Sequence, residues 1–142
     1  MSALPDPRRL TRELLAFNTI NPPGMERACA RHLGAMLEAA GFRVAYHEFA
    51  EGRTSLIAQV GGGVAKPPIC FTGHIDTVPL GAARWHRDAF AGETDGDRLY
   101  GRGSTDMKSG TVSMWPVKQI GARESSPPMR AMRLVRDSAN SW

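Results

Sequence analysis

The order of the helix and strand signals in this sequence predicts an α/β fold. Two segments with apolar residues at helical spacing come first, and three short segments rich in β-branched and aromatic residues follow them. The last of the three, residues 69–72, is the near-continuous apolar run Ile-Cys-Phe-Thr, which is typical of a strand buried in a sheet. Helices followed by strands in this order favour a mixed domain over an all-β one.

The individual elements are predicted from their boundary residues. A first helix should begin at Pro7 with Asp6 as its N-cap, because proline is favoured in the first helical turn. A second helix is expected over 25–41, where a glycine ends the apolar repeat. Strands are expected at 42–49 and 54–60, ahead of the buried strand.

A long polar segment and an unusual tail complete the chain. Residues 79–105 have no regular pattern, and loops of this length are uncommon inside a domain unless they are functional. A third helix is expected to start near Asp106. Beyond it, prolines and the loss of apolar period disfavour regular structure, apart from a weak helix over 129–142. The chain therefore divides into residues 1–110 and a tail, residues 111–142. We expect the tail to be translated in a shifted reading frame or to be disordered.

Composition limits the functional classes. With 142 residues, 42% of them hydrophobic, the chain is large enough for one domain with a core. It has no apolar stretch near the ~18 residues of a membrane span and no secretory signal, so we expect no membrane partner. Cys29 and Cys70 lack a Cys-x-x-Cys spacing and are interpreted as buried thiols of a reducing, cytoplasmic compartment. The net charge of +4 lies mostly in the tail rather than on a clustered basic face, so we expect no nucleic-acid partner.

The first candidate site is in residues 72–79, which read Thr-Gly-His-Ile-Asp-Thr-Val-Pro. Residues two apart in a strand share a face, so His74 and Asp76 can address one site. A metal-bound imidazole usually donates its other ring N–H to a carboxylate or a carbonyl, which makes this pair a candidate ligand and orienting group. The alternative is a histidine hydrogen-bonded at a strand end beside a turn aspartate, and the His-x-Asp spacing alone favours that alternative.

The second candidate site is the glycine-rich segment 101–110, Gly-Arg-Gly-Ser-Thr-Asp-Met-Lys-Ser-Gly. It approaches a phosphate-binding loop, but Met107 replaces the second glycine that such a loop needs. Asp106 would repel phosphate and attract a metal ion, although it could also simply cap a helix. Arg102 and Lys108 could hold Asp106 in place or face solvent, and the sequence does not choose between these.

Three motifs together resemble a known family. They are residues 72–79, the Trp-His-Arg-Asp-Ala-Phe segment 85–90, and residues 99–110. They are similar to the co-catalytic zinc amidohydrolases and peptidases, which include acetylornithine deacetylase, succinyl-diaminopimelate desuccinylase, aminoacylases and glutamate carboxypeptidases. The resemblance covers about residues 5–110. It implies the N-terminal portion of a zinc-peptidase-type catalytic domain, with a mostly parallel central sheet that is incomplete in this chain.

The resemblance also implies a chemistry and residue roles. The activity would be metal-dependent hydrolysis of amide bonds, of the acetylornithine deacetylase-like type, on small N-acyl amino acids or peptides. His74 would bind one of two zinc ions, with cobalt or manganese as substitutes, and Asp106 would bridge both ions. Asp76 would be the catalytic-site carboxylate that orients His74. The segment 85–90 is expected to pack the loop rather than contact substrate.

The rest of the family's ligand set has no match here. The family continues with a Glu-Glu pair, a further carboxylate and a histidine, whereas this sequence has no Glu-Glu pair and no histidine after His86. A zinc site needs about three or four protein ligands per ion, so residues 1–110 are expected to be a partial catalytic domain, truncated and inactive alone. The alternatives are a non-catalytic remnant that binds metal or associates with a full-length relative, and a nucleotide-binding module, which Asp106 and Met107 disfavour.

Overall fold

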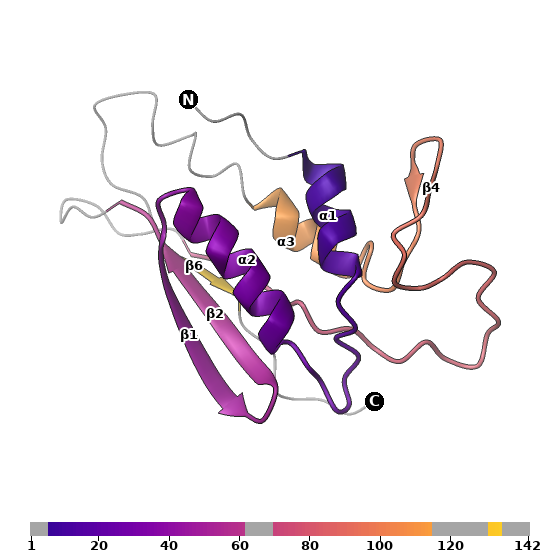
Figure 1. Cartoon of the computed structure of the whole chain (residues 1–142), viewed down its shortest axis with the longest axis horizontal. Helices are drawn as coiled ribbons and strands as arrows, with labels where there is room; N and C mark the ends of the chain where they lie inside the picture. The colour runs from indigo at the N-terminus through magenta and orange to yellow at the C-terminus, as the bar shows by residue number, and fades with distance from the viewer. Residues whose placement is uncertain (1–5, 62–69, 115–130, 135–142) are drawn as a thin grey trace.

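The computed structural model describes residues 6–61, 70–114 and 131–134, and it has an α/β fold (Figure 1). A four-stranded sheet packs against helices, and a separate two-stranded hairpin projects from the body. In chain order the elements are α1 (Pro7–Leu15), α2 (Arg27–Ala39), β1 (Arg43–Ala50), β2 (Arg53–Gln59), β3 (Phe71–Gly73), β4 (Thr94–Asp95), β5 (Arg98–Leu99), α3 (Lys108–Ser113) and β6 (Ala131–Leu134).

Both N-terminal helices confirm their predictions. Pro7 opens α1, and the side chain of Asp6 accepts a hydrogen bond from the backbone N–H of Arg8 at 3.0 Å, as an N-cap does. Helix α2 ends just before Gly41, whose φ of +84° is a conformation that glycine adopts without strain. Helix α2 lies across β1 and β2, and α1 lies against α3 (Figure 1).

Strands β1 and β2 form an antiparallel hairpin. Only Glu51 and Gly52 separate them, and Gly52 has a φ of +72° in the turn. A two-residue connection permits only antiparallel pairing, because parallel neighbours need a crossover of a dozen or more residues. Thr54, Leu56 and Ala58 form the buried side of β2 beneath α2.

The mostly parallel sheet that the resemblance implied is wrong for the described strands. The strand order is β1-β2-β6-β3, and both the β1–β2 and the β2–β6 pairings are antiparallel. Among the described strands of this sheet, β3 and β6 form the one parallel pair. The arrangement implied by the resemblance does not hold for β1 and β2, because the two-residue connection between them permits only antiparallel pairing.

The structure also revises part of the tail. Residues 131–134 are a strand in the sheet, so the weak helix expected over 129–142 is wrong at these positions. Residues 111–113 are the last residues of α3, the helix that was expected to start near Asp106. The remainder of the tail, 115–130 and 135–142, lies outside the described residues. The division of the chain at residue 110 therefore stays a prediction.

The core lies between the helices and the sheet. Cys29 is buried there, as expected, whereas Cys70 is exposed, which corrects the expectation of two buried thiols. Cys70 comes just before β3 and so lies outside the packed part of the sheet. No helix in the described part of the chain is long and apolar enough to cross a membrane. The buried core residues are Leu10, Leu14, Cys29, Ala30, Leu33, Leu37, Phe42, Leu56, Ala58, Ile75 and Val112.

Candidate metal site

The backbone that follows β3 is held by the loop that follows α1. The N–H of Thr77 donates to the carbonyl of Thr19 at 2.9 Å, and the N–H of Asn21 donates to the carbonyl of Thr77 at 2.8 Å. These bonds form a parallel bridge between Ile20 and Thr77. Residues 74–77 are therefore fixed in an extended course at the end of the strand.

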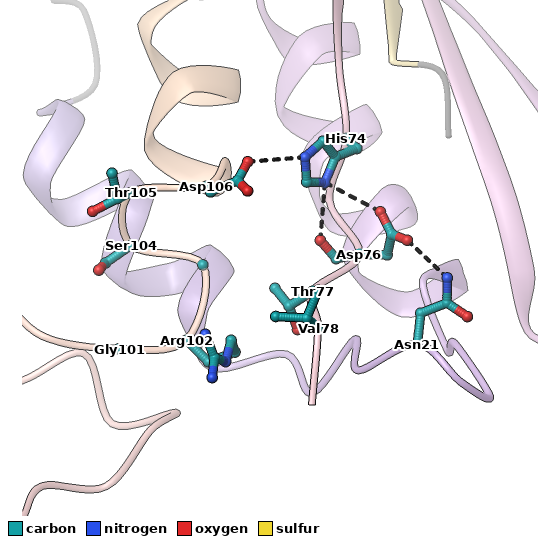
Figure 2. Close-up of a pocket in the computed structure, with 11 residues that line it drawn as sticks. Asn21, His74, Asp76, Thr77, Val78, Gly101, Arg102, Ser104, Thr105 and Asp106 are labelled. Atoms are coloured by element: carbon teal, nitrogen blue, oxygen red, sulfur yellow. Dashed lines mark hydrogen bonds and ion pairs between the residues drawn. The ribbon is translucent and has the colours of Figure 1, made fainter. Parts of the chain in front are cut away.

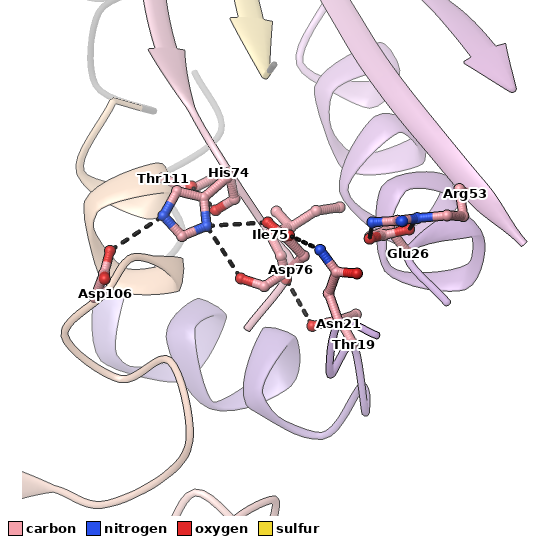
Figure 3. A network of polar contacts seen from close by, with 9 residues as sticks. All are labelled: Thr19, Asn21, Glu26, Arg53, His74, Ile75, Asp76, Asp106 and Thr111. Carbon is pink, nitrogen blue, oxygen red and sulfur yellow. Dashed lines mark hydrogen bonds and ion pairs between the residues drawn. The ribbon is translucent and has the colours of Figure 1, made fainter. Parts of the chain in front are cut away.

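Two buried threonines fix the same segment from either side (Figure 3). The hydroxyl of Thr111, on α3, donates to the carbonyl of His74 at 3.2 Å. The hydroxyl of Thr19 donates to the carbonyl of Ile75 at 2.6 Å. Sequence reasoning missed both threonines, because no local pattern marks a hydroxyl that will meet a carbonyl dozens of residues away.

The imidazole of His74 lies between two aspartates (Figure 2). Its Nδ1 is 3.0 Å from the backbone oxygen of Asp76 and 3.2 Å from the Oδ1 of that residue. Its Nε2 is 3.1 Å from Oδ1 of Asp106. The side chain of Asp106 is 85% exposed, whereas that of His74 is 34% exposed. The structure thus brings all three sequence-predicted site residues together.

Asn21 extends this chain of contacts by one residue (Figure 3). Its Nδ2 donates to Oδ2 of Asp76 at 3.1 Å, so that the two carboxylate oxygens of Asp76 have different partners. Sequence analysis did not identify Asn21 as a site residue. Its role depends on the pairing of its loop with the end of β3, which no local signal reveals.

The surroundings of His74 favour a positive charge on or beside its ring. The hydrogen bond to Asp76 is the largest influence and raises the pKa of His74 to about 9, against an opposing effect of partial burial. The nearby Asp106 carboxylate adds to the increase in pKa. An imidazole in this position attracts a proton or a metal cation.

The backbone course before α3 presents Asp106 to His74. Gly103 has a φ of +87°, and a Cβ there would lie 2.8 Å from Cγ2 of Thr77, so this position requires glycine. The N-cap of α3 is Met107, and no side chain caps that helix. The alternative in which Asp106 is only a helix cap is therefore wrong. Its carboxylate faces His74 instead.

The structure also decides between the two interpretations of Lys108. Lys108 is fully buried, and its Nζ donates to the carbonyls of Leu14 and Phe17 at 2.9 and 2.8 Å. These carbonyls lie at and just beyond the C-terminal end of α1, where a cation is favourable. Lys108 therefore holds the segment that carries Asp106 against α1. Arg102 bonds to neither Lys108 nor Asp106. Its Nη2 donates to the carbonyl of Pro79 at 2.9 Å.

These residues fit part of a zinc site. Two ligand atoms that are each about 2.0–2.2 Å from a tetrahedral zinc ion lie roughly 3.3–3.6 Å apart. The 3.1 Å between Nε2 of His74 and Oδ1 of Asp106 is close to that separation. No group of three or more His, Cys, Asp or Glu side chains suited to a metal ion occurs among the described residues. This part of the chain therefore offers two candidate donors, His74 and Asp106, and one candidate orienting carboxylate, Asp76.

The pocket beside these donors has a volume of about 270 Å³. Figure 2 shows His74 and Asp106 at one end of it and Arg102 at the opposite end. Residues from three separate regions line it: the loop after α1, the end of β3 and the segment before α3. They are Asn21, His74, Asp76, Thr77, Val78, Gly101, Arg102, Gly103, Ser104, Thr105 and Asp106.

The sequence of this chain is similar to a family of known proteins. Residues 70–128 match the model of peptidase family M20/M25/M40. Over 112 residues the chain is 40% identical to succinyl-diaminopimelate desuccinylase of Wolbachia sp. subsp. Brugia malayi (strain TRS). Over this part of its length, the chain matches the M20 peptidase family. The resemblance drawn from the three sequence motifs is thereby confirmed.

The chain matches only part of each M20 relative. The Wolbachia alignment covers 76% of this chain and 27% of that protein. The succinyl-diaminopimelate desuccinylase of Rhodospirillum centenum (strain ATCC 51521 / SW) is 34% identical over 136 residues, which cover 92% of this chain and 34% of that protein. The chain thus spans about a quarter to a third of the length of these relatives.

Solved structures of M20 peptidases share the fold. The M20 family metallo-carboxypeptidase Sso-CP2 from Sulfolobus solfataricus matches with a TM-score of 0.76 at 19% identity, over 92% of this chain and 30% of that one. Human carnosine dipeptidase 1 matches with a TM-score of 0.69 at 19% identity, over 89% of this chain and 30% of that one. At this identity the likeness concerns the fold alone.

Proposed function

We propose that this chain provides one side of a metal-dependent amide hydrolase centre of the deacylase type. The observation that carries the proposal is the His74 imidazole held between the carboxylates of Asp76 and Asp106. Nδ1 of the ring contacts Asp76, and Nε2 lies 3.1 Å from the Asp106 carboxylate at one end of the pocket. The match to the M20 peptidases supports hydrolysis as the reaction class.

Each residue has a distinct part in this proposal. His74 and Asp106 would hold the metal, zinc or its substitutes cobalt and manganese, through Nε2 and the carboxylate. When bound, the metal supplies Lewis acidity toward the amide carbonyl and acidifies water. Asp76 would accept a hydrogen bond from Nδ1–H of His74, so that the lone pair of Nε2 could bind the metal. Asn21 and Thr19 keep Asp76 and the backbone beside it in place.

The proposed substrates are small N-acyl amino acids or peptides. The names of the two relatives, both succinyl-diaminopimelate desuccinylases, support removal of an acyl group from an amino acid. The acetylornithine deacetylase-like specificity rests on the sequence motifs alone. A cytoplasmic location remains part of the proposal.

The first experiment measures metal binding by the purified chain. Cobalt(II) titration, followed by its visible absorption and by elemental analysis, should reveal bound metal that is lost in His74→Ala. The matched control is His47→Ala, since His47 is exposed on β1 far along the chain from the site. Equal metal binding in both variants would overturn the assignment of His74 as a ligand.

A second candidate function is metal or partner binding without turnover. The observation that favours it is the supply of two donors in the described residues, fewer than a complete zinc site uses. Association with a full-length relative would supply the remaining ligands. Metal binding by the chain without hydrolysis of N-succinyl or N-acetyl amino acids, restored by adding such a relative, would distinguish this candidate from the first.

A further inference from the structure

A second pocket adjoins the proposed metal site and shares Arg102 with it. It has a volume of about 440 Å³, which is within the range of small-molecule sites. Its lining includes several basic side chains and no acidic one. The lining residues are Leu80, Ala83, Arg84, Trp85, His86, Arg87, Tyr100 and Arg102.

Arg102 forms no ion pair with another side chain in the described part of the chain. Its guanidinium lies 5.0 Å from the Trp85 ring centroid and donates one hydrogen bond through Nη2, to the carbonyl of Pro79. Its Nε is buried without a hydrogen-bond partner. A guanidinium offers five N–H donors in a fixed fork, so this one has capacity left for a ligand.

The other arginines of the pocket differ in how much charge they contribute. Arg87 forms ion pairs with Glu93 and Asp95, both at 3.1 Å, which largely neutralise it. Arg84 is exposed and forms no ion pair within the described residues. The uncompensated charge of the pocket is therefore concentrated at Arg84 and Arg102.

Trp85 gives this pocket a fixed wall. Its indole Nε1 donates to the carbonyl of Leu80 at 3.0 Å, so the ring is anchored although it lies at the surface. Arg102 stacks on that ring, which limits the orientations of the guanidinium. An arginine held in this way loses little conformational entropy when it binds a planar anion.

We infer that this pocket binds a carboxylate of the substrate, with Arg102 as its main contact and Arg84 as its second. The inference rests on the proposed function, because Arg102 also lines the pocket of the proposed metal site, at the end opposite to His74 and Asp106, so one substrate could reach both. Arginine and carboxylate match geometrically through two parallel hydrogen bonds. The chain would then select substrates with an anionic group near the scissile bond.

The test is succinate binding to the metal-free chain, followed by NMR of the tryptophan indoles and arginine Nε groups. It is done with a chelator present, so that failure of the proposed metal site does not affect it. Succinate should shift the Trp85 indole signal, which Trp85→Phe identifies among the three tryptophans. Arg102→Gln should weaken binding about tenfold or more, since hydrogen bonds to charged groups are worth about 1.5–3 kcal/mol.

The control variant is Arg98→Gln, whose substitution lies in the projecting β4–β5 hairpin. It should bind succinate as the parent chain does. Neutral succinamide should not bind. If Arg102→Gln does not fold, Arg102→Lys and Arg84→Gln should each weaken binding. Unchanged binding in these variants, equal binding of succinamide, or tighter binding of inorganic phosphate than of succinate would overturn the inference.

Discussion

In the proposed metal site, Asp76 would determine which nitrogen of His74 is available to a metal. Replacing it by asparagine keeps the size of the side chain but removes the charge that favours a basic imidazole. We expect Asp76→Asn to reduce cobalt(II) affinity about 10- to 100-fold, as losses of such orienting groups typically do. Competition with a chromophoric chelator measures this. The control is Asp97→Asn, an exposed residue paired with Arg8, and a similar loss in that variant would contradict the role of Asp76.

The two cysteines differ in reactivity for a physical reason. Burial raises the pKa of the Cys29 thiol to about 11, whereas Cys70 is exposed. Because the thiolate is the reactive form, a raised pKa keeps Cys29 protonated and unreactive at pH 8. A disulfide reagent should therefore modify one thiol rapidly in the native chain and the second only after denaturation. Cys70→Ser should remove the rapid phase and Cys29→Ser should not. A rapid phase that survives in Cys70→Ser would contradict this.

Between elements, Lys108 joins the start of α3 to the end of α1. Lys108→Met would leave the carbonyls of Leu14 and Phe17 without their donor. Since each hydrogen bond to a charged group is worth about 1.5–3 kcal/mol, we expect a loss of about 3 kcal/mol in the free energy of unfolding. Urea denaturation measures it. Arg98→Met, which removes an exposed cation, should change stability by less than about 0.5 kcal/mol.

A buried ion pair joins the start of α2 to the start of β2. Arg53 Nη2 is 3.0 Å from Oε1 of Glu26, and their side chains are only 13% and 4% exposed. Glu26→Gln would leave the arginine buried and unpaired, and we expect a loss of about 3–5 kcal/mol in the free energy of unfolding. The control is Glu48→Gln, which breaks the half-exposed pair with Arg27 and should cost less than about 1 kcal/mol. Equal losses would contradict the distinction.

At the scale of the whole molecule, local signals predicted the elements but not their arrangement. The N-cap at Asp6 and the glycine stop at Gly41 depend on neighbouring residues, and both are confirmed. The motifs around His74 and Asp106 pointed to two side chains that the structure brings within 3.1 Å of each other, and their role as metal ligands stays a prediction. The pairing of β2 with β6, the burial of Lys108 and the contact of Asn21 with Asp76 depend on residues far apart in sequence, and single-sequence patterns do not encode such contacts.

The position of β6 leads to the last prediction, because this strand comes from the tail that the sequence set apart. Met132 is in register with Ala58 of β2 and with Phe71 of β3, so it links the hairpin to the strand that precedes His74. Met132→Pro removes the backbone N–H and the regular strand geometry at that link. We expect faster amide hydrogen exchange in both neighbouring strands and weaker cobalt(II) binding at His74.

Met132→Ile is the matched control, because it keeps the backbone N–H and has high strand propensity. Parent-like exchange and metal binding in Met132→Ile, with both impaired in Met132→Pro, would show that at least residues 131–134 of the tail belong to the fold that carries the site. Unchanged exchange in Met132→Pro would instead mean that the sheet does not depend on this strand. The site would then be held without help from β6, which would favour a boundary between the fold and the tail after α3.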